Sequence, residues 1–329
     1  MANLLGFVVR RLLASIVVVW AIITIVFFLA HASPYDPVRL ALGRFYTVNP
    51  SVAQHMRHIY GLDLPLWRQY FRFLWMLLQG NLGYSSEVSR MGVSVWVILQ
   101  GGVPVTMKLG LWALIISLIV GLPAGLYSAL HQNSFLDHFL QGSLIFLYVI
   151  PIFVLVPFCQ LFFGAFLHWL PVYGWGDGGW TGPFGFIPLG LSIKEMVLPV
   201  ACYAAGLAGF FAKSFRSFVL EVMRQDYIRT ARAKGLKNRV VVYLHACKNT
   251  LLPLASIVGP TIAFLIVGAF LIEYLFSIPG IAYITVSSIQ TSDYDVIEAT
   301  TIMLVVLIIV VNMLTDIFYA IIDPRVRLE

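Results

Sequence analysis

Cationic side chains gather in one short stretch, DYIRTARAKGLKNRVVVYLHACKN, which occupies residues 226–249. Nine Lys and Arg lie between Lys213 and Lys248 and are offset by Glu221 and Asp226, which leaves a local net charge of +7. Clustered cations do not make a catalytic site without a nucleophile, a base or a phosphate-binding loop. The sequence contains no GxxxxGK[ST], GxSxG or HExxH pattern. The stretch therefore predicts a surface that binds and does not catalyse.

Thiols and imidazoles are too scattered to hold a metal ion. Cys159, Cys202 and Cys247 lie far apart, and no CxxC pair occurs. His55 and His58 have the spacing of one helix face, but no cysteine or acidic ligand accompanies them. We expect free thiols, no metal site, no catalytic residues and no cofactor bound by this chain.

The composition is that of a membrane protein. Of 329 residues, 60% are hydrophobic and 11% are charged, whereas a soluble domain carries about 25% charged residues. Runs of roughly 20 apolar residues, enough for a helix to cross a membrane, occupy residues 12–30, 103–128, 138–167, 197–219, 251–275 and 299–322. The sequence predicts an all-α polytopic membrane protein with six transmembrane helices, of which the first is not a cleaved signal.

The chain divides into three predicted parts. Residues 1–32 are the N-terminal tail and the first transmembrane helix. Residues 33–100 are less apolar, contain Pro34, Pro37, Pro50 and Pro65, and predict a small extracytoplasmic insertion on the membrane surface. Residues 101–329 are a five-helix core that includes the loop 220–250.

Lys and Arg in the connections predict the orientation of the helices. With the N-terminus inside, thirteen cations lie on the inner side and seven on the outer side, six of them in the long segment 33–100, which weighs little. Both termini are therefore expected in the cytoplasm. The net charge of +6 reflects this topology, and we expect a lipid bilayer and no nucleic acid as partner.

The connection between the fourth and fifth runs is longer than two antiparallel helices require. RTARAK contains good helix formers, Gly235 is expected to end that helix, and Asn238 is expected to cap a second one. A compact knob of this kind has a shape suited to docking a partner.

The loop also resembles a known family. DYIRTARAKGL, followed by His245, Asn249 and Pro253 at four-residue steps, is similar to the EAA loop of ABC importer permeases, in the variant of the dipeptide, oligopeptide and nickel systems. Arg229, Thr230 and Ala231 stand where the wider superfamily has Glu, Ala, Ala. GLDLPLWRQYFRFLWMLLQGNLGYS at residues 61–85 and the segment 279–328 also resemble the B-type peptide permease.

The resemblance implies a type I ABC importer permease fold in the cytoplasmic (inner) membrane of a prokaryote. It implies a heteromeric complex with a second homologous permease subunit, two ABC ATPase subunits that bind ATP and Mg, and an extracytoplasmic substrate-binding protein. The implied function is ATP-driven import of di- or oligopeptides by alternating access, without an ATPase site in this chain. In that family the loop forms a coupling helix, which assigns ATPase coupling to Asp226, Tyr227, Arg229, Thr230, Ala231, Lys234 and Gly235.

Other functions stay open at this point. Relatives handle nickel chelates, glutathione or sugars, so the substrate does not follow from the loop. A secondary transporter without an ATPase usually needs an acid or a histidine near the bilayer midplane, and the sequence offers no convincing candidate. An intramembrane enzyme would need paired catalytic residues, which are missing.

Several residues in the apolar runs predict contacts between helices. Asn312, Asp316 and Tyr319, followed by Asp323, share one face of the last helix and predict a polar helix interface. Small residues that let helix backbones approach occur at Gly121, Gly125, Gly206 and Gly209. Glu273 is expected at the outer end of the fifth helix as an acid that reaches the membrane interface, with a gate contact as the alternative.

Overall fold

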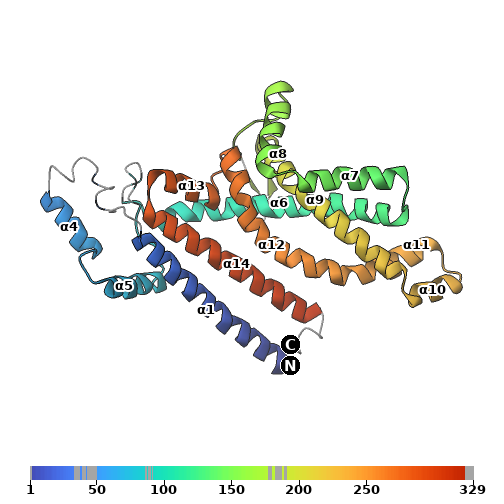
Figure 1. Cartoon of the computed structure of the whole chain (residues 1–329), viewed down its shortest axis with the longest axis horizontal. Helices are drawn as coiled ribbons and strands as arrows, with labels where there is room; N and C mark the ends of the chain where they lie inside the picture. Colours follow the sequence, from blue (N-terminus) through green and yellow to red (C-terminus); the bar gives the residue numbers. More distant parts are fainter. Residues whose placement is uncertain are drawn as a thin grey trace. The chain divides into compact units, whose positions relative to one another are not determined.

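The computed structural model of the chain describes residues 2–32, 38, 42, 50–85, 87, 90, 92–176, 180–181, 187–188 and 191–322. These residues are largely helical (Figure 1). The helices are α1 (Ala2–Ala32), α4 (Pro50–Tyr60), α5 (Leu66–Leu78), α6 (Val95–Leu130), α7 (Phe135–Val149), α8 (Ile152–Cys159), η1 (Gln160–Phe166), α9 (Leu191–Met223), α10 (Asp226–Ala233), α11 (Asn238–Val240), η3 (Val241–Cys247), α12 (Lys248–Phe276), α13 (Ile281–Thr291) and α14 (Tyr294–Ile322). Two short strands, β1 (Trp180–Thr181) and β2 (Ile187–Pro188), pair antiparallel with Trp180 opposite Pro188.

Five helical stretches among the described residues are long and apolar enough to cross a membrane. They are Val8–Ala32, Val95–Leu130, Ile193–Met223, Asn238–Phe276 and Tyr294–Ile317. A sixth crossing would need the pair Phe135–Val149 and Ile152–Phe166, whose axes differ by 104°. The predicted all-α membrane class is confirmed, and the apolar run 138–167, which contains Pro151, is a bent pair of helices and not a single straight one.

The break in this third span lies at Pro151. Proline has no N–H to donate, and it disfavours helical backbone at the residue before it. Ile150 is extended, with φ −62° and ψ 126°, and Pro151 is the N-cap residue of α8. At about 1.5 Å per residue, the 15 residues of α7 extend about 22 Å, less than a hydrocarbon core of roughly 30 Å.

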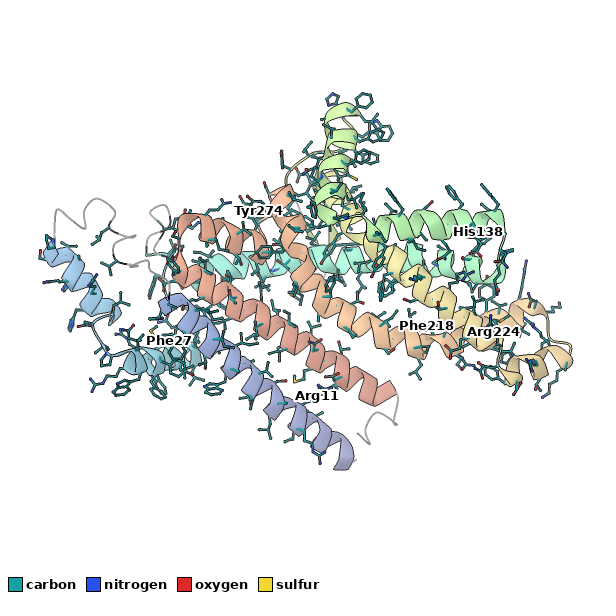
Figure 2. The ribbon with its side chains drawn as sticks, in the orientation of Figure 1. Arg11, Phe27, His138, Phe218, Arg224 and Tyr274 are labelled. Atoms are coloured by element: carbon teal, nitrogen blue, oxygen red, sulfur yellow. The ribbon has the colours of Figure 1, made fainter. Side chains whose placement is uncertain are left out.

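The chain separates into two compact units. The first contains Met1–Arg10, Thr106–Ile278 and Val310–Glu329, and the second contains Arg11–Val105 and Pro279–Ile309. In the second unit α5 packs on α1, where the Phe27 ring (Figure 2) lies 5.3 Å from Tyr70 and 5.4 Å from Phe73 between centroids. The Thr24 and Tyr70 hydroxyls are 2.7 Å apart. The division of the chain into three parts, with boundaries after residues 32 and 100, stays a prediction.

A second cluster in that unit joins the start of α6 to α13 and α14. Its buried members are Val95, Leu99, Ile284, Val296 and Ala299. The Ser85 hydroxyl donates a hydrogen bond to the fully buried Asp293, which follows α13. These contacts hold the connection after α5 against the start of α14.

Small residues bring α6, α7 and α9 together in the first unit. A Cβ on Gly121 or Gly125 of α6 would lie 2.7 or 2.5 Å from the carbonyl oxygens of Ala208 and Ala212 on α9. A Cβ on Gly209 of α9 would overlap the Leu144 carbonyl of α7. The backbones therefore pack without intervening side chains, and the predicted contact role of these glycines is confirmed.

Candidate functional site

Helix α10 presents most of the predicted coupling residues on its outer surface. This short helix lies between the end of α9 and η3 in the chain (Figure 1), and Arg224 precedes its first turn (Figure 2). The exposed members of the predicted set are Asp226, Tyr227, Arg229, Thr230, Lys234 and Gly235. Ala231 is buried. The predicted helix is confirmed, and the structure brings six of the seven residues to one exposed loop.

The inner face of α10 holds the loop to its own base. Ile228 and Ala231, three residues apart on one helix face, are buried together with Val241 and Ala246 of η3, and Val222 and Met223 at the end of α9 pack on the same cluster. Burial of an isoleucine contributes roughly 1.5–3 kcal/mol, which fixes the rotation of the helix. Ala231 thus supports the loop from inside and is not placed to touch a partner.

Gly235 ends α10 through a Schellman motif. Its N–H donates to the Arg232 carbonyl at 2.9 Å, and the Leu236 N–H donates to the Ala231 carbonyl at 3.4 Å. The φ of Gly235 is +75°, a conformation that glycine adopts without a Cβ penalty. The prediction that Gly235 ends the helix is confirmed.

The returning half of the loop differs from the prediction. Lys237, and not Asn238, is the N-cap residue of α11, and its side chain makes no capping bond. The chain then continues as the π-helix η3, whose hydrogen bonds join residues five apart. This wider turn places Val241 and Ala246 on the side that faces α10. The Asn249 side chain donates to the Tyr227 hydroxyl at 3.0 Å, which ties α12 to the first turn of α10.

Charges on the outer face of α10 are solvated. Arg229 Nη1 lies 3.4 Å from Asp226 Oδ1, and the two side chains are 77% and 94% exposed. An exposed ion pair of this kind contributes about 0–1 kcal/mol. Arg232, Lys234 and Lys237 are also exposed. These charges are therefore available to an external partner at little energetic cost.

A partly buried polar network that the sequence did not predict lies between α6, α7 and α9. Arg216 on α9 donates to Asp137 Oδ2 at 3.0 Å through Nη2 and to Ser128 Oγ at 3.1 Å through Nε. Gln141 Nε2 donates to Ser128 Oγ at 3.0 Å, and the Ser128 hydroxyl donates to Asp137 Oδ1. An arginine within the apolar run 197–219 was the available signal. Its partner Asp137 is 79 residues earlier in the sequence, so the spacing of residues within one segment could not predict the pair.

Glu273 is a second buried acid, and the prediction for it is wrong. It is fully buried, and Thr106 Oγ1 on α6 donates to its Oε1 at 2.6 Å. A side chain that reaches the membrane interface keeps its carboxylate in water. The Glu273 carboxylate instead joins α12 to α6.

The predicted polar face of α14 is described only in part. Asn312 is exposed and Asp316 is half-buried. The side chain of Tyr319 and the whole of Asp323 lie outside the described residues. The role of this face as a helix interface stays a prediction.

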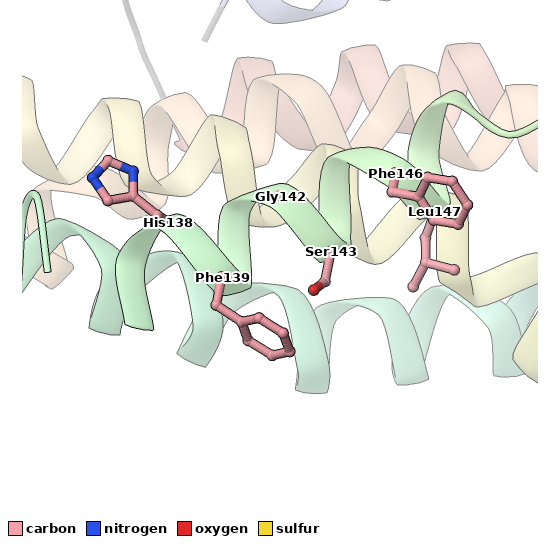
Figure 3. A pocket seen from close by; sticks show the side chains of 6 residues that line it. All are labelled: His138, Phe139, Gly142, Ser143, Phe146 and Leu147. Carbon is pink, nitrogen blue, oxygen red and sulfur yellow. The ribbon is translucent and has the colours of Figure 1, made fainter. Parts of the chain in front are cut away.

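The described part of the chain holds no cluster of metal ligands, and neither of two pockets there is an enclosed, peptide-sized site. No group of three or more His, Cys, Asp or Glu is placed there to hold a metal ion. A groove along α7 is lined by one helix alone, through His138, Phe139, Gly142, Ser143, Phe146 and Leu147 (Figure 3). A cavity in the second unit, lined in part by Asn81, Asp295 and Glu298, has a volume of about 50 Å³, too small for a peptide.

Comparisons with known proteins identify the family. Residues 121–328 match the model of the binding-protein-dependent transport system inner membrane component, and residues 4–109 match the N-terminal model of such membrane components. The chain is 33% identical over 324 residues to the oligopeptide transport system permease protein OppB of Haemophilus influenzae. The matched region covers 98% of this chain and 100% of the relative. The chain belongs to the family of binding-protein-dependent transport system inner membrane components.

Two further comparisons agree with this assignment. The dipeptide transport system permease protein DppB of Lactococcus lactis is 33% identical over 322 residues, which cover 98% of this chain and 99% of DppB. A solved structure of the MetNI methionine ABC transporter in inward facing conformations superimposes with a TM-score of 0.55 and 16% identity. The match covers 69% of this chain and 97% of that chain, and it establishes a shared fold.

Proposed function

We propose that this chain is the transmembrane subunit of an ATP-driven ABC importer that carries di- or oligopeptides across the cytoplasmic membrane of a prokaryote. The observation that carries the proposal is α10, a helix fixed by a buried apolar face whose polar face is free for a partner. The names of the relatives, oligopeptide and dipeptide permease proteins, support peptides as the substrate class.

The proposed complex contains a second homologous permease subunit, two ABC ATPase subunits and an extracytoplasmic substrate-binding protein. ATP and Mg bind to the ATPase subunits, because the sequence of this chain has no loop that would cradle phosphates. The excess of Lys and Arg at positions 10–11, 213–248 and 325–327 supports a cytoplasmic location for α10 and for both termini.

In the proposed mechanism, closure of the ATPase subunits displaces α10. Val222 and Met223 of α9 and the residues of η3 pack on the buried face of α10, so the displacement moves the ends of α9 and α12 together. The helices then open outward to accept a peptide and reopen inward to release it. Asp226, Tyr227, Arg229, Thr230 and Lys234 supply outer contacts to the ATPase, while Ala231 and Gly235 maintain the shape of the loop.

Two alanines near the end of α10 allow a direct test. Ala233 is exposed, whereas Ala231 is buried, so bulk at position 233 obstructs a partner without disturbing the cluster beneath. We expect Ala233→Trp to lower peptide uptake by about tenfold, the effect of roughly 1.4 kcal/mol lost at the interface. Ala233→Ser is the matched control and should import normally. Uptake and ATP hydrolysis are measured separately in proteoliposomes that contain the whole complex, and normal uptake by Ala233→Trp would refute the docking role.

Different experiments decide between the alternatives. Peptide uptake by the purified chain alone under an ion gradient would favour a secondary transporter. Titration of the partner binding protein with dipeptides, longer peptides, a nickel chelate, glutathione and a sugar identifies the cargo. Binding of a peptide supports the proposed substrate class, and binding of another cargo alone would contradict it.

A further inference from the structure

The network of Ser128, Asp137, Gln141 and Arg216 lies at one end of the small-residue contact between α6 and α9. Along α6 this contact runs through Gly121, Gly125 and Ser128, and along α9 it runs through Ala208, Ala212 and Arg216. Steps of three and four residues keep each set on one helix face. The contact therefore changes from close backbone packing to charged hydrogen bonds one turn beyond Ala212.

Hydrogen bonds within this network are mutually satisfied. A serine hydroxyl has one proton to donate and two acceptor sites. Arg216 Nε and Gln141 Nε2 can only donate, so they occupy the acceptor sites of Ser128 and its proton goes to Asp137. The Asp137 carboxylate also accepts from Arg216 and from the Asn133 backbone N–H at 3.0 Å. Because Ser128 and Asp137 are buried, hydrogen bonds satisfied in this way favour a single arrangement.

Asp137 connects the hairpin of α6 and α7 to α9. Its backbone N–H donates to the N-cap residue Ser134 at 3.1 Å, which starts α7, while its side chain binds Arg216. Ser128 lies in the last turn of α6. Asp137 lies in the first turn of α7, next to His138, which Figure 2 labels. One arginine on α9 therefore contacts both arms of the hairpin.

Arg216 also lies close to the end of α9 that carries the coupling loop. It precedes Met223, the last residue of α9, by seven residues, roughly 10 Å along the helix. Val222 and Met223 pack directly on the buried face of α10. A displacement of α10 thus reaches Arg216 through two turns of one continuous helix.

We propose, on the basis of the coupling role proposed for α10, that Arg216 is a positioning residue for transport. Through Asp137 and Ser128 it makes the hairpin of α6 and α7 move together with α9 when α10 is displaced. If the network is weakened, α9 moves and the hairpin lags behind. ATP is then hydrolysed with fewer peptides imported.

The first test measures peptides imported per ATP hydrolysed by the complete complex in proteoliposomes. Arg216→Lys keeps the charge but loses the planar fork that reaches Ser128 and Asp137 together, and Asp137→Asn keeps the shape but loses the charge. We expect each to lower the ratio by about three- to tenfold. Lys213→Met removes an exposed cation one turn earlier on α9 and should leave the ratio unchanged. A normal ratio in assembled Arg216→Lys and Asp137→Asn complexes would overturn the proposal.

A second measurement separates positioning from a loss of folding. In a chain whose Cys159, Cys202 and Cys247 are replaced by alanine, spin labels at His131→Cys and Glu221→Cys, both exposed positions, report the distance between the hairpin turn and the end of α9. In the intact network this distance should stay constant with and without ATP, and in Arg216→Lys it should differ between the two states. A distance that changes with ATP in the chain with the intact network would contradict the proposal. This part of the experiment does not require any Arg216 or Asp137 variant to fold.

Parallel assay of Ala233→Trp distinguishes the two proposals. If Ala233→Trp imports normally, the coupling role of α10 fails and this inference fails with it. If Ala233→Trp uncouples import and the Arg216 and Asp137 variants do not, only the positioning role of Arg216 is wrong.

Discussion

Two arginine–aspartate pairs near the end of α9 show how burial changes the value of one kind of contact. On α10, Arg229 and Asp226 are 3.4 Å apart with side chains 77% and 94% exposed. Between α9 and α7, Arg216 and Asp137 are 3.0 Å apart with side chains 27% and 3% exposed. Water competes for the hydrogen bonds of the first pair, so its charges remain accessible to a partner. In the second pair, Arg216 and Asp137 bind each other and Ser128. The exposed pair therefore leaves its charges on the surface of α10, whereas the pair with buried Asp137 joins α9 to α7.

Removal of Arg216, the cation that pairs with the buried Asp137, should have the largest effect on stability. Arg216→Met leaves the Asp137 carboxylate buried beside Ser128 without its cation, which should lower the free energy of unfolding by about 3 kcal/mol or more. Arg229→Met, the matched change at the exposed pair, should lower it by less than about 1 kcal/mol. Denaturant or thermal unfolding of the reconstituted protein measures both. Equal losses would remove the distinction between the two pairs.

Changes at two glycines of α9 should have an intermediate effect. A Cβ on Gly209 overlaps the Leu144 carbonyl of α7, so Gly209→Ala forces the helices apart and should cost about 1–3 kcal/mol. At Gly206 a Cβ would lie 3.7 Å from the Leu147 carbonyl, an ordinary contact. Gly206→Ala is therefore the matched control and should be neutral or slightly stabilising in the same unfolding assay. A larger loss at Gly206 would contradict the packing described for this interface.

The loop glycine should show the smallest effect. A Cβ on Gly235 meets nothing within 4 Å, so only its φ of +75° opposes Gly235→Ala, at about 1 kcal/mol. We expect faster hydrogen exchange of the Gly235 and Leu236 amides, because the Schellman motif at the end of α10 is weakened. Gly142→Ala on α7, which is also free of neighbours but has no positive φ, should leave the exchange of these two amides unchanged. Unaltered exchange in Gly235→Ala would show that the motif does not hold the loop.

Local signals in the sequence predicted the features that depend on neighbouring residues. The helix formers of RTARAK and the glycine after them predicted α10 and its end, and the spacing of Gly121 and Gly125 predicted a close helix contact. Apolar runs predicted six spans, and five of them are single helices in the structure. Asn238 shows the limit of such signals, because the N-cap residue of α11 is Lys237 and no side chain caps that helix.

Features that depend on distant residues were not predictable in the same way. Pro151 separates two helices, while Pro199, Pro253 and Pro260 lie inside continuous ones, so proline alone does not decide where a span breaks. Glu273 is buried because Thr106 on another helix binds it, and Asp137 finds its cation on α9. Such partners are set by tertiary packing, which spacing along one segment does not reveal.

Whether an ATPase subunit contacts α10 is measured most directly by a spin label on Arg229→Cys, in a chain whose Cys159, Cys202 and Cys247 are replaced by alanine. The side chain at this position points outward and is 77% exposed. We expect the label to be mobile in the isolated chain, immobilised when the ATPase subunits are added, and altered again by ATP. A label that stays equally mobile with and without the ATPase subunits would contradict the account.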